Sequence, residues 1–246
     1  MSTAPTTPPP VKGRGSWTRT GGLLPAKPGG RGRGYYRTNT LAEEMVGSAW
    51  FTGYDTSDNA HAVWFGVQVV QNFAGMRGAA CDGLFGPMTF AAVIRLQKAL
   101  GVEADGIVGP ATMRAALAPL ITVTAGAGGV PPKLLGGIVA VESEYDPAAV
   151  GYDTPADHGL VQINLRAHVA VSLVQAMDPT YSLTWAANTM GKAHARFDAA
   201  HHKNADPWLA AVLNHNSPRN ARLYAESGIF PTVQAQTYVE RVTSAW

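Results

Sequence analysis

The chain has 246 residues, 46% of them hydrophobic and 15% charged, and a formal net charge of +2. This length and composition suffice for one large or two modest soluble domains with hydrophobic cores. A single cysteine, Cys81, excludes an intramolecular disulfide and any zinc or redox site built from several cysteines. We therefore expect folding to rest on core packing, with no metal and no cofactor.

The first ten residues run through threonines and prolines, unlike the apolar stretch of about 7 to 15 residues that is typical of a signal peptide. The most apolar region, residues 115–141, is broken by Gly-Gly-Val-Pro-Pro-Lys, whereas a membrane helix needs roughly 20 unbroken apolar residues. We expect neither a signal peptide nor membrane insertion.

Residues 1–45 are predicted to form a flexible basic arm. Residues 1–34 hold 14 glycines and prolines, a composition that cannot offset the entropy of ordering by burial. Residues 1–42 hold seven of the 19 basic residues and no acidic one. The arm could bind an anionic polymer or a neighbouring subunit, although a solvated tail is the simpler interpretation. A disordered arm offers no folded basic surface with aromatic side chains, so we expect no nucleic-acid partner.

Residues 46–118 are predicted to form a small three-helix module, because they contain an internal repeat. Asp82-Gly-Leu-Phe-Gly-Pro-Met-Thr and Asp105-Gly-Ile-Val-Gly-Pro-Ala-Thr are offset by 23 residues. In each copy Asp-Gly favours a tight turn, and the proline suits the first turn of a helix. Apolar residues recur at helical spacing before the first copy and between the two, where the helix also carries Gln97.

This doubled motif resembles the peptidoglycan-binding domain family over about 57 residues. The resemblance implies that bacterial peptidoglycan is a partner and that the binding groove lies near the repeated turns. The candidate wall-binding residues are those of the turns: Asp82, Gly86, Asp105 and Gly109. A purely structural duty in the turns explains them equally well.

Residues 119–130 are uncharged and rich in alanine, glycine and threonine, which we interpret as a linker to a second domain at 131–246. Pro131-Pro132 can begin a helix that ends near Ser143. Glu142 follows Ile138 by four residues, so its carboxyl group lies on the apolar face, at the negative end of the helix dipole. Such a glutamate is suited to donating a proton near neutral pH, although its position alone fits a solvated glutamate at the helix rim equally well.

Three ordered motifs in the second domain resemble the soluble lytic transglycosylase and goose-type lysozyme superfamily, over about 115 residues. They are Glu142-Ser followed by Asp-Pro-Ala-Ala-Val-Gly, then Gly159-Leu-Val-Gln-Ile-Asn164, then Trp208-Leu-Ala-Ala-Val-Leu-Asn214 with a closing Tyr238-Val. The resemblance implies a mainly α-helical, lysozyme-like domain. It also implies that Glu142 is the general acid, which protonates the oxygen leaving between N-acetylmuramic acid and N-acetylglucosamine. The residues that it implies contact the glycan are Ser143, Gly159, Gln162, Asn164, Asn214 and Tyr238.

The reaction product stays open between two outcomes. A lytic transglycosylase needs no second carboxylate, because a hydroxyl of the muramoyl sugar closes a 1,6-anhydro ring. A hydrolase needs an activated water, and the goose-type pattern places an aspartate at Asp153, with Asp157 as a second candidate. The transglycosylase pattern Ala-Tyr-Asn-Ala-Gly reads Val212-Leu-Asn-His-Asn here, so the tyrosine that usually faces the glutamate is missing from it.

The sequence supports other functions less strongly than it supports a wall-cutting enzyme. The seven histidines form no ligand spacing of a known metal site, and His194 is better placed for helix packing. A catalytically inactive wall-binding or virion structural protein is the rival to the enzyme. Without a signal peptide, a wall-cutting enzyme suggests a bacteriophage endolysin or tail-associated lysin, made in the host cytoplasm and acting on the cell wall. In a tail-associated lysin, the basic arm could anchor the chain to other virion proteins. A bacterial enzyme exported by another route is the alternative.

Overall fold

The computed structural model describes residues 66–83, 87–151, 157–199 and 205–246. Within them the chain is mainly α-helical, which confirms the predicted fold class, with a two-stranded antiparallel sheet. None of the described helices combines the length and the apolar character needed to cross a membrane. The predicted arm, residues 1–45, lies outside the described residues.

The elements follow a helical stretch at residues 66–73. In chain order they are η2 (Gly78–Ala80), α2 (Pro87–Leu100), α3 (Pro110–Ala127), α4 (Pro132–Ser143), β1 (Asp157–His158), β2 (Ile163–Asn164), α5 (Leu173–Met177), α6 (Pro179–Ala199), α7 (Pro207–Asn216), α8 (Pro218–Ser227) and α9 (Val233–Ser244). Contacts divide the chain into two compact units. Unit 1 comprises the described residues of two segments, Met1–Leu117 and Tyr145–Pro179. Unit 2 comprises Ala118–Glu144 and the described residues of Thr180–Trp246.

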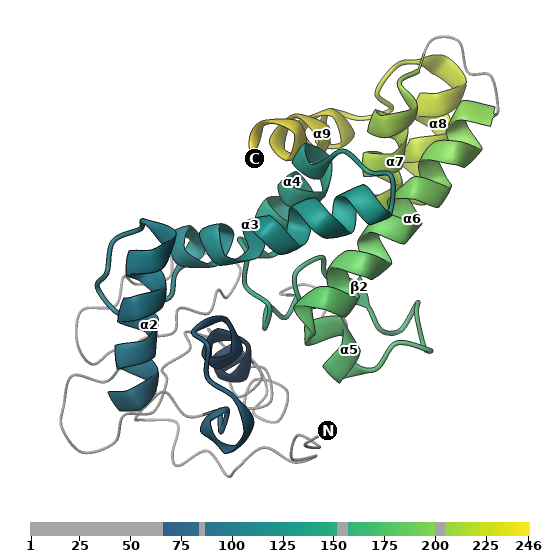
Figure 1. The fold of residues 1–246 in the computed structure, drawn as a ribbon. Helices are drawn as coiled ribbons and strands as arrows, with labels where there is room; N and C mark the ends of the chain where they lie inside the picture. The colour runs from purple at the N-terminus through teal and green to yellow at the C-terminus, as the bar shows by residue number, and fades with distance from the viewer. Residues whose placement is uncertain (1–65, 84–86, 152–156, 200–204) are drawn as a thin grey trace. The chain divides into compact units, whose positions relative to one another are not determined.

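The first half of unit 1 is the predicted repeat module (Figure 1). Each Gly-Pro-x-Thr motif begins a helix at its proline, because proline fixes the backbone for the first helical turn and lacks only an N–H that this turn leaves unpaired. The buried apolar side chains of the module include Val67, Val70, Ala92, Val93, Val108, Met113 and Leu117.

The second half of unit 1 is a small antiparallel sheet backed by a short helix. Asp157 pairs with Asn164 and His158 with Ile163, and Val150 forms an isolated bridge to His158. Helix α5 packs against β1 and begins with a capping box in which Ser172 and Gln175 satisfy each other's backbone N–H groups.

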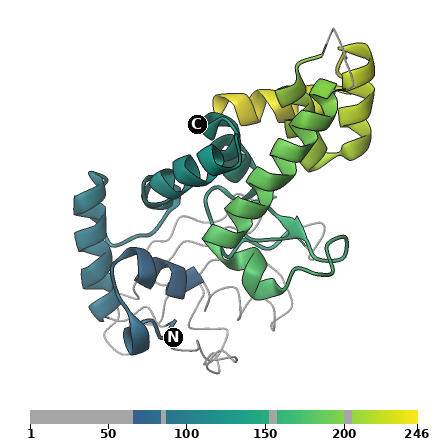
Figure 2. The same ribbon diagram turned by 45° about the vertical axis from the view of Figure 1, so that its right-hand side comes forward.

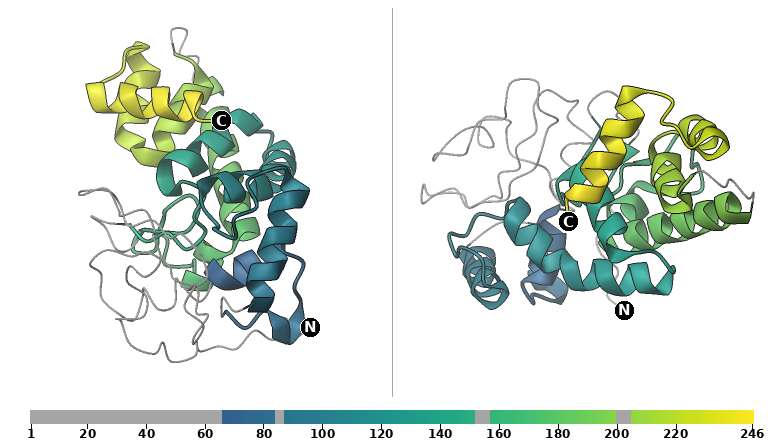
Figure 3. Two further views of the ribbon diagram at one scale, coloured as in Figure 1. Left: turned by 90° about the vertical axis from the view of Figure 1, so that its left-hand side faces the viewer. Right: turned by 90° about the horizontal axis from the view of Figure 1, so that it is seen from above.

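Unit 2 is all helical among its described residues. The long helix α6 runs beside the paired α7 and α8, and α9 lies against α4 (Figures 1 to 3). Asp206, Ser217 and Thr232 cap the N-termini of α7, α8 and α9 through side-chain oxygens that accept backbone N–H bonds. The turn after α3 approaches α6 closely, since a Cβ on Gly128 would lie 2.8 Å from the Cβ of Ala187.

The predicted linker is wrong over most of its length, because α3 continues to Ala127. Pro119 removes one hydrogen bond inside this helix. The helix persists across it because Ile121 and Ala125 are fully buried, and alanine and leucine favour helix. Tertiary burial therefore outweighs the glycine and threonine content that suggested an irregular connector.

Gly106, in the second repeat turn, should not tolerate a side chain. It has a φ of +78°, and a Cβ there would overlap the ring of Phe90. Gly101 is a matched control, because its φ is +69° and nothing lies within 4 Å of its Cβ position. We expect Gly101→Ala to lower the free energy of unfolding by about 1–2 kcal/mol, and Gly106→Ala by about 1–3 kcal/mol more. Thermal and denaturant unfolding measure both variants. If Gly106→Ala destabilised the protein no more than Gly101→Ala does, the Phe90 ring would move aside without loss of stability.

Candidate functional site

Helix α4 places Glu142 in its last turn, as predicted. The apolar face of this helix is buried, with Leu135 and Ile138 fully inaccessible, while Glu142 is half-buried. The helix ends because Glu144 adopts a left-handed conformation, with φ 51° and ψ 39°, and its N–H donates to the carbonyl of Ala140 at 3.2 Å. Glu142 thus follows Leu135 and Ile138 on the buried face of α4, at the end of a helix that is anchored in the core.

Tyr238, on α9, is the partner of Glu142. Its hydroxyl donates to Oε1 of Glu142 at 2.6 Å, and its side chain is 9% exposed. This distance is within the range of a hydrogen bond to an ionised carboxylate. The bond fixes one carboxyl oxygen and leaves Oε2 to carry a proton. The tyrosine of the transglycosylase pattern beside Asn214 is absent, and Tyr238 of α9 is a separate residue that bonds to the glutamate.

Left-handed backbone occurs just after Glu142 and at one of the predicted substrate residues. Among the described residues, the non-glycine positions with positive φ are Glu144 (51°), Tyr145 (68°) and Gln162 (51°). Such conformations cost of order 1–3 kcal/mol each and persist only where the surroundings impose them. Tyr145 is 5% exposed; burial raises the pKa of its phenol, and the guanidinium of Arg114 opposes this rise.

Gly159 and Gln162 shape a turn in unit 1. Nε2 of Gln162 donates to the carbonyls of Ala149 (3.2 Å) and Gly159 (3.0 Å). Gly159 has a φ of +76°, and a Cβ there would overlap the carbonyl oxygen of Ala176. Its N–H donates to Ala149 at 2.8 Å, and its carbonyl also accepts from the N–H of Gln162 at 3.2 Å. Gly159 is buried, with its backbone N–H and C=O both bonded within the unit, and its contact with the glycan stays a prediction.

Two further predicted substrate residues bond to nearby backbone. Oδ1 of Asn164 accepts from the N–H groups of Arg166 and Ala167, at 3.1 and 2.9 Å. Oγ of Ser143 donates to the carbonyl of Val139 at 3.1 Å, and Ser143 is buried. Asn164 thus stabilises the turn that follows it, and Ser143 bonds to the preceding turn of its own helix.

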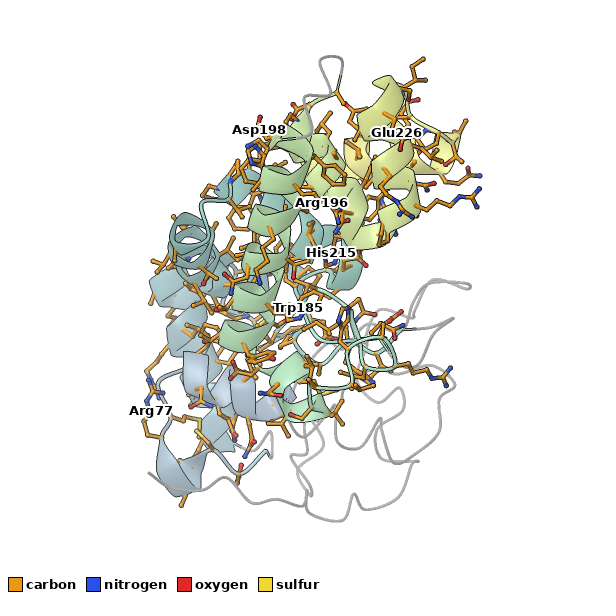
Figure 4. All side chains as sticks on the ribbon, turned by 90° about the vertical axis from the view of Figure 1, so that its right-hand side faces the viewer. Arg77, Trp185, Arg196, Asp198, His215 and Glu226 are labelled. Atoms are coloured by element: carbon orange, nitrogen blue, oxygen red, sulfur yellow. The ribbon has the colours of Figure 1, made fainter. Side chains whose placement is uncertain are left out.

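Asn214 lies at the C-terminal end of α7, where Arg196 of α6 holds it. Nη2 of Arg196 donates to Oδ1 of Asn214 at 2.7 Å. The next residue, His215, contacts Trp185 edge to face, with ring centroids 6.3 Å apart. Figure 4 shows Trp185, Arg196 and His215 along the α6–α7 side of unit 2. Sequence reasoning identified Asn214 but missed Arg196, because their pairing depends on how two helices pack.

Two predicted residues lie outside the described ranges, namely Asp153 and Gly86. Asp157 is the first residue of β1 and is half-buried. In the described part of the chain, no three or more His, Cys, Asp or Glu side chains are grouped to hold a metal ion. His194 instead stacks on Trp208, with ring centroids 3.9 Å apart, which confirms its predicted packing role.

In the second repeat, Gln97 is fully buried and connects the turn to the next helix. Its Nε2 donates to Oδ1 of Asp105 (3.0 Å), to the carbonyl of Ile107 (3.0 Å) and to Oγ1 of Thr112 (3.2 Å). Its Oε1 accepts from the N–H of Gly106 at 2.9 Å. The aspartate, glycine and threonine of the motif are therefore held by one glutamine.

The first repeat is built in the same way around Gln71. Its Nε2 donates to Asp82 (2.8 Å) and Thr89 (3.1 Å), and its Oε1 accepts from the N–H of Gly83 (3.0 Å). Sequence analysis missed Gln71, although its place before the first motif is the signal that could have found it. Asp82 and Asp105 thus have a demonstrated structural role in the turns.

Two known families match the chain one after the other, and the second match spans residues of both compact units. Residues 72–116 match the family described as "Putative peptidoglycan binding domain", and residues 119–221 match the Transglycosylase SLT domain. The chain is a peptidoglycan-cleaving enzyme of the lytic transglycosylase type. Its peptidoglycan-binding domain precedes the transglycosylase domain. None of the curated proteins matches the chain. Tyr238 lies beyond the matched residues, so its link to Glu142 comes from the structure alone.

Proposed function

We propose that Glu142 cleaves the β-1,4 bond between N-acetylmuramic acid and N-acetylglucosamine, acting first as acid and then as base. The observation that carries this proposal is the 2.6 Å hydrogen bond from Tyr238 to Oε1 of Glu142. It orients a half-buried carboxyl group at the end of a helix that is otherwise anchored in the core. General acid catalysis needs a carboxyl group held in this way within reach of the leaving oxygen.

In the proposed reaction, Oε2 of Glu142 gives its proton to the glycosidic oxygen, and the bond from that oxygen to C1 of the muramoyl sugar breaks. N-acetylglucosamine leaves with a hydroxyl group. The 6-hydroxyl of the muramoyl sugar then attacks C1, and its proton passes to Glu142. A 1,6-anhydro ring forms, no water is consumed, and the enzyme recovers its starting protonation state.

The 1,6-anhydro product is favoured over hydrolysis by the match of residues 119–221 to the transglycosylase domain. Hydrolysis would need a second carboxylate to activate water, and Asp153 remains the candidate for that role. The tyrosine missing beside Asn214 still sets this chain apart from the transglycosylase pattern, whereas the phenol hydroxyl of Tyr238 at the glutamate supports the proposed role of Glu142.

Mass spectrometry of the fragments released from purified peptidoglycan tests the proposal. We expect 1,6-anhydro ends from the wild type and none from Glu142→Gln. Reducing ends that depend on Glu142 would make the enzyme a hydrolase. If neither protein released fragments, the chain would be an inactive wall-binding or virion structural protein.

We also propose that the repeat module directs the enzyme to the wall. Gln71 and Gln97 bond to the aspartate, glycine and threonine at matching positions of the two motifs, which supports a shared role of the two repeats. In this proposal Asp82 and Asp105 act by holding the turns, while Gly109 and Gly86 remain candidate wall contacts. The phage setting stays a prediction, because the arm assigned to virion contacts lies outside the described residues.

Removing the Tyr238 hydroxyl should slow the reaction without unfolding the chain. In Tyr238→Phe the ring still fills its place on α9, but Oε1 of Glu142 loses its donor. One hydrogen bond to a charged group contributes about 1.5–3 kcal/mol, which corresponds to roughly a 10- to 100-fold loss in kcat. Turnover of soluble glycan and a thermal melt measure the two effects. Tyr224→Phe is the matched control, because its hydroxyl meets the backbone of Asp206 instead.

A further inference from the structure

Two adjacent buried glycines, Gly136 and Gly137, lie where α4 meets α9. A Cβ on Gly137 would overlap the backbone carbonyl oxygen of Val242, which is fully buried. A Cβ on Gly136 would instead overlap the indole ring of Trp246. A side chain at Gly137 would therefore collide with the backbone of Val242. A side chain at Gly136 would collide only with the ring of Trp246, which can rotate away.

The same contacts show how the two helices run. Gly136 meets Trp246, Gly137 meets Val242, and Glu142 meets Tyr238, so the numbers rise along α4 as they fall along α9. The helices are antiparallel. At a rise of 1.5 Å per residue, Glu142 lies about 7.5 Å along α4 from Gly137, and Tyr238 lies about 6 Å along α9 from Val242. The backbone contact is thus about one helical turn away from the hydrogen bond.

We propose that Gly137 is a positioning residue for the reaction. Because it has no side chain, the backbone of α9 at Val242 can touch α4, and this sets the separation at which the Tyr238 hydroxyl reaches Glu142. A side chain at 137 would force α9 outward through rigid backbone, one turn from the 2.6 Å bond. The inference rests on the proposed role of Glu142.

The test compares Gly137→Ala with Gly136→Ala in the full chain. We expect Gly137→Ala to lower kcat on soluble glycan by about 100-fold, the scale of a misplacement near 1 Å, with little change in KM. Gly136→Ala should stay close to wild type, and adding Trp246→Ala should remove any remaining deficit. Alanine is the better helix former at both positions, so helix propensity predicts no loss in either variant. Equal kcat values for the two variants would overturn the proposal.

A double-mutant cycle separates positioning from a general loss of packing. If Gly137 acts through Tyr238, Gly137→Ala should cost little further activity in a Tyr238→Phe background. Additive losses would show that it acts elsewhere and would also overturn the proposal. If Gly137→Ala fails to fold, Val242→Ile adds one methyl group at the same crossing and takes its place in the cycle. The proposed role of Glu142 fails separately, if Glu142→Gln retains activity.

Discussion

Replacing Glu142 with glutamine should lower the release of glycan fragments by about 10³-fold, within the range that general acid–base catalysis contributes. Glutamine has nearly the same shape, and its amide oxygen can still accept the hydrogen bond that Tyr238 donates at 2.6 Å. The amide cannot supply the proton that the leaving oxygen needs, nor take one from the attacking hydroxyl. We therefore expect the variant to fold and to bind the wall like the wild type.

Glu144→Gln is the matched control, since Glu144 follows two residues later, beyond the end of α4. Glu144→Gln removes one negative charge, as Glu142→Gln does, but leaves the proposed acid in place. Fragment release should therefore remain near the wild-type rate. Mass spectrometry and pull-down on purified peptidoglycan measure cleavage and binding side by side. Cleavage by Glu142→Gln at the wild-type rate would rule out Glu142 as the acid.

The second large effect is expected from Gln97→Leu in the repeat module. Leucine fills a similar volume but makes none of the four hydrogen bonds of the buried amide, with Asp105, Gly106, Ile107 and Thr112. Each buried group left unsatisfied costs about 1–3 kcal/mol. A total loss of about 3 kcal/mol or more is enough to unfold a small module. Retention on insoluble peptidoglycan should therefore fall more than turnover of short soluble glycans.

Gln68→Leu provides the control for this variant. Gln68 is half-buried and donates one bond, to the carbonyl of Cys81 at 2.7 Å. Water can reach the groups that this substitution exposes, so wall retention should change little. If Gln97→Leu binds the wall as well as Gln68→Leu does, the repeat turns are not what holds the enzyme there.

Local signals in the sequence predicted the starts of three helices, the end of one of them and the place of the proposed acid. Pro87, Pro110 and Pro132 each begin a helix, and Glu142 stands in the last turn of α4 as the apolar spacing indicated. These signals succeed because a proline or an apolar period acts within a few residues of itself. The linker prediction failed over residues 119–127 because burial of Ile121 is a tertiary effect that composition does not report.

Residue roles were harder to predict than residue positions. The expected contacts of Gln162 and Asn164 with the glycan stay predictions, and the structure adds that both side chains hold backbone turns. Amides suit either task, and the choice depends on which carbonyls and N–H groups the fold brings near. Arg196 carried no motif that marked it, because it acts through a partner on another element, and Gln71 was marked only by its place before the first motif.

The span of chain between Glu142 and Tyr238 bears on the order of folding. Their hydrogen bond joins residues 96 positions apart, whereas the glutamine bonds of the repeat module join residues 8 to 18 apart. Closing a long loop costs more entropy than closing a short one, so contacts between distant residues form more slowly. We expect the repeat turns to assemble early and the tyrosine to reach the glutamate late. A chain still emerging from the ribosome would then carry a glutamate that is not yet oriented by its partner.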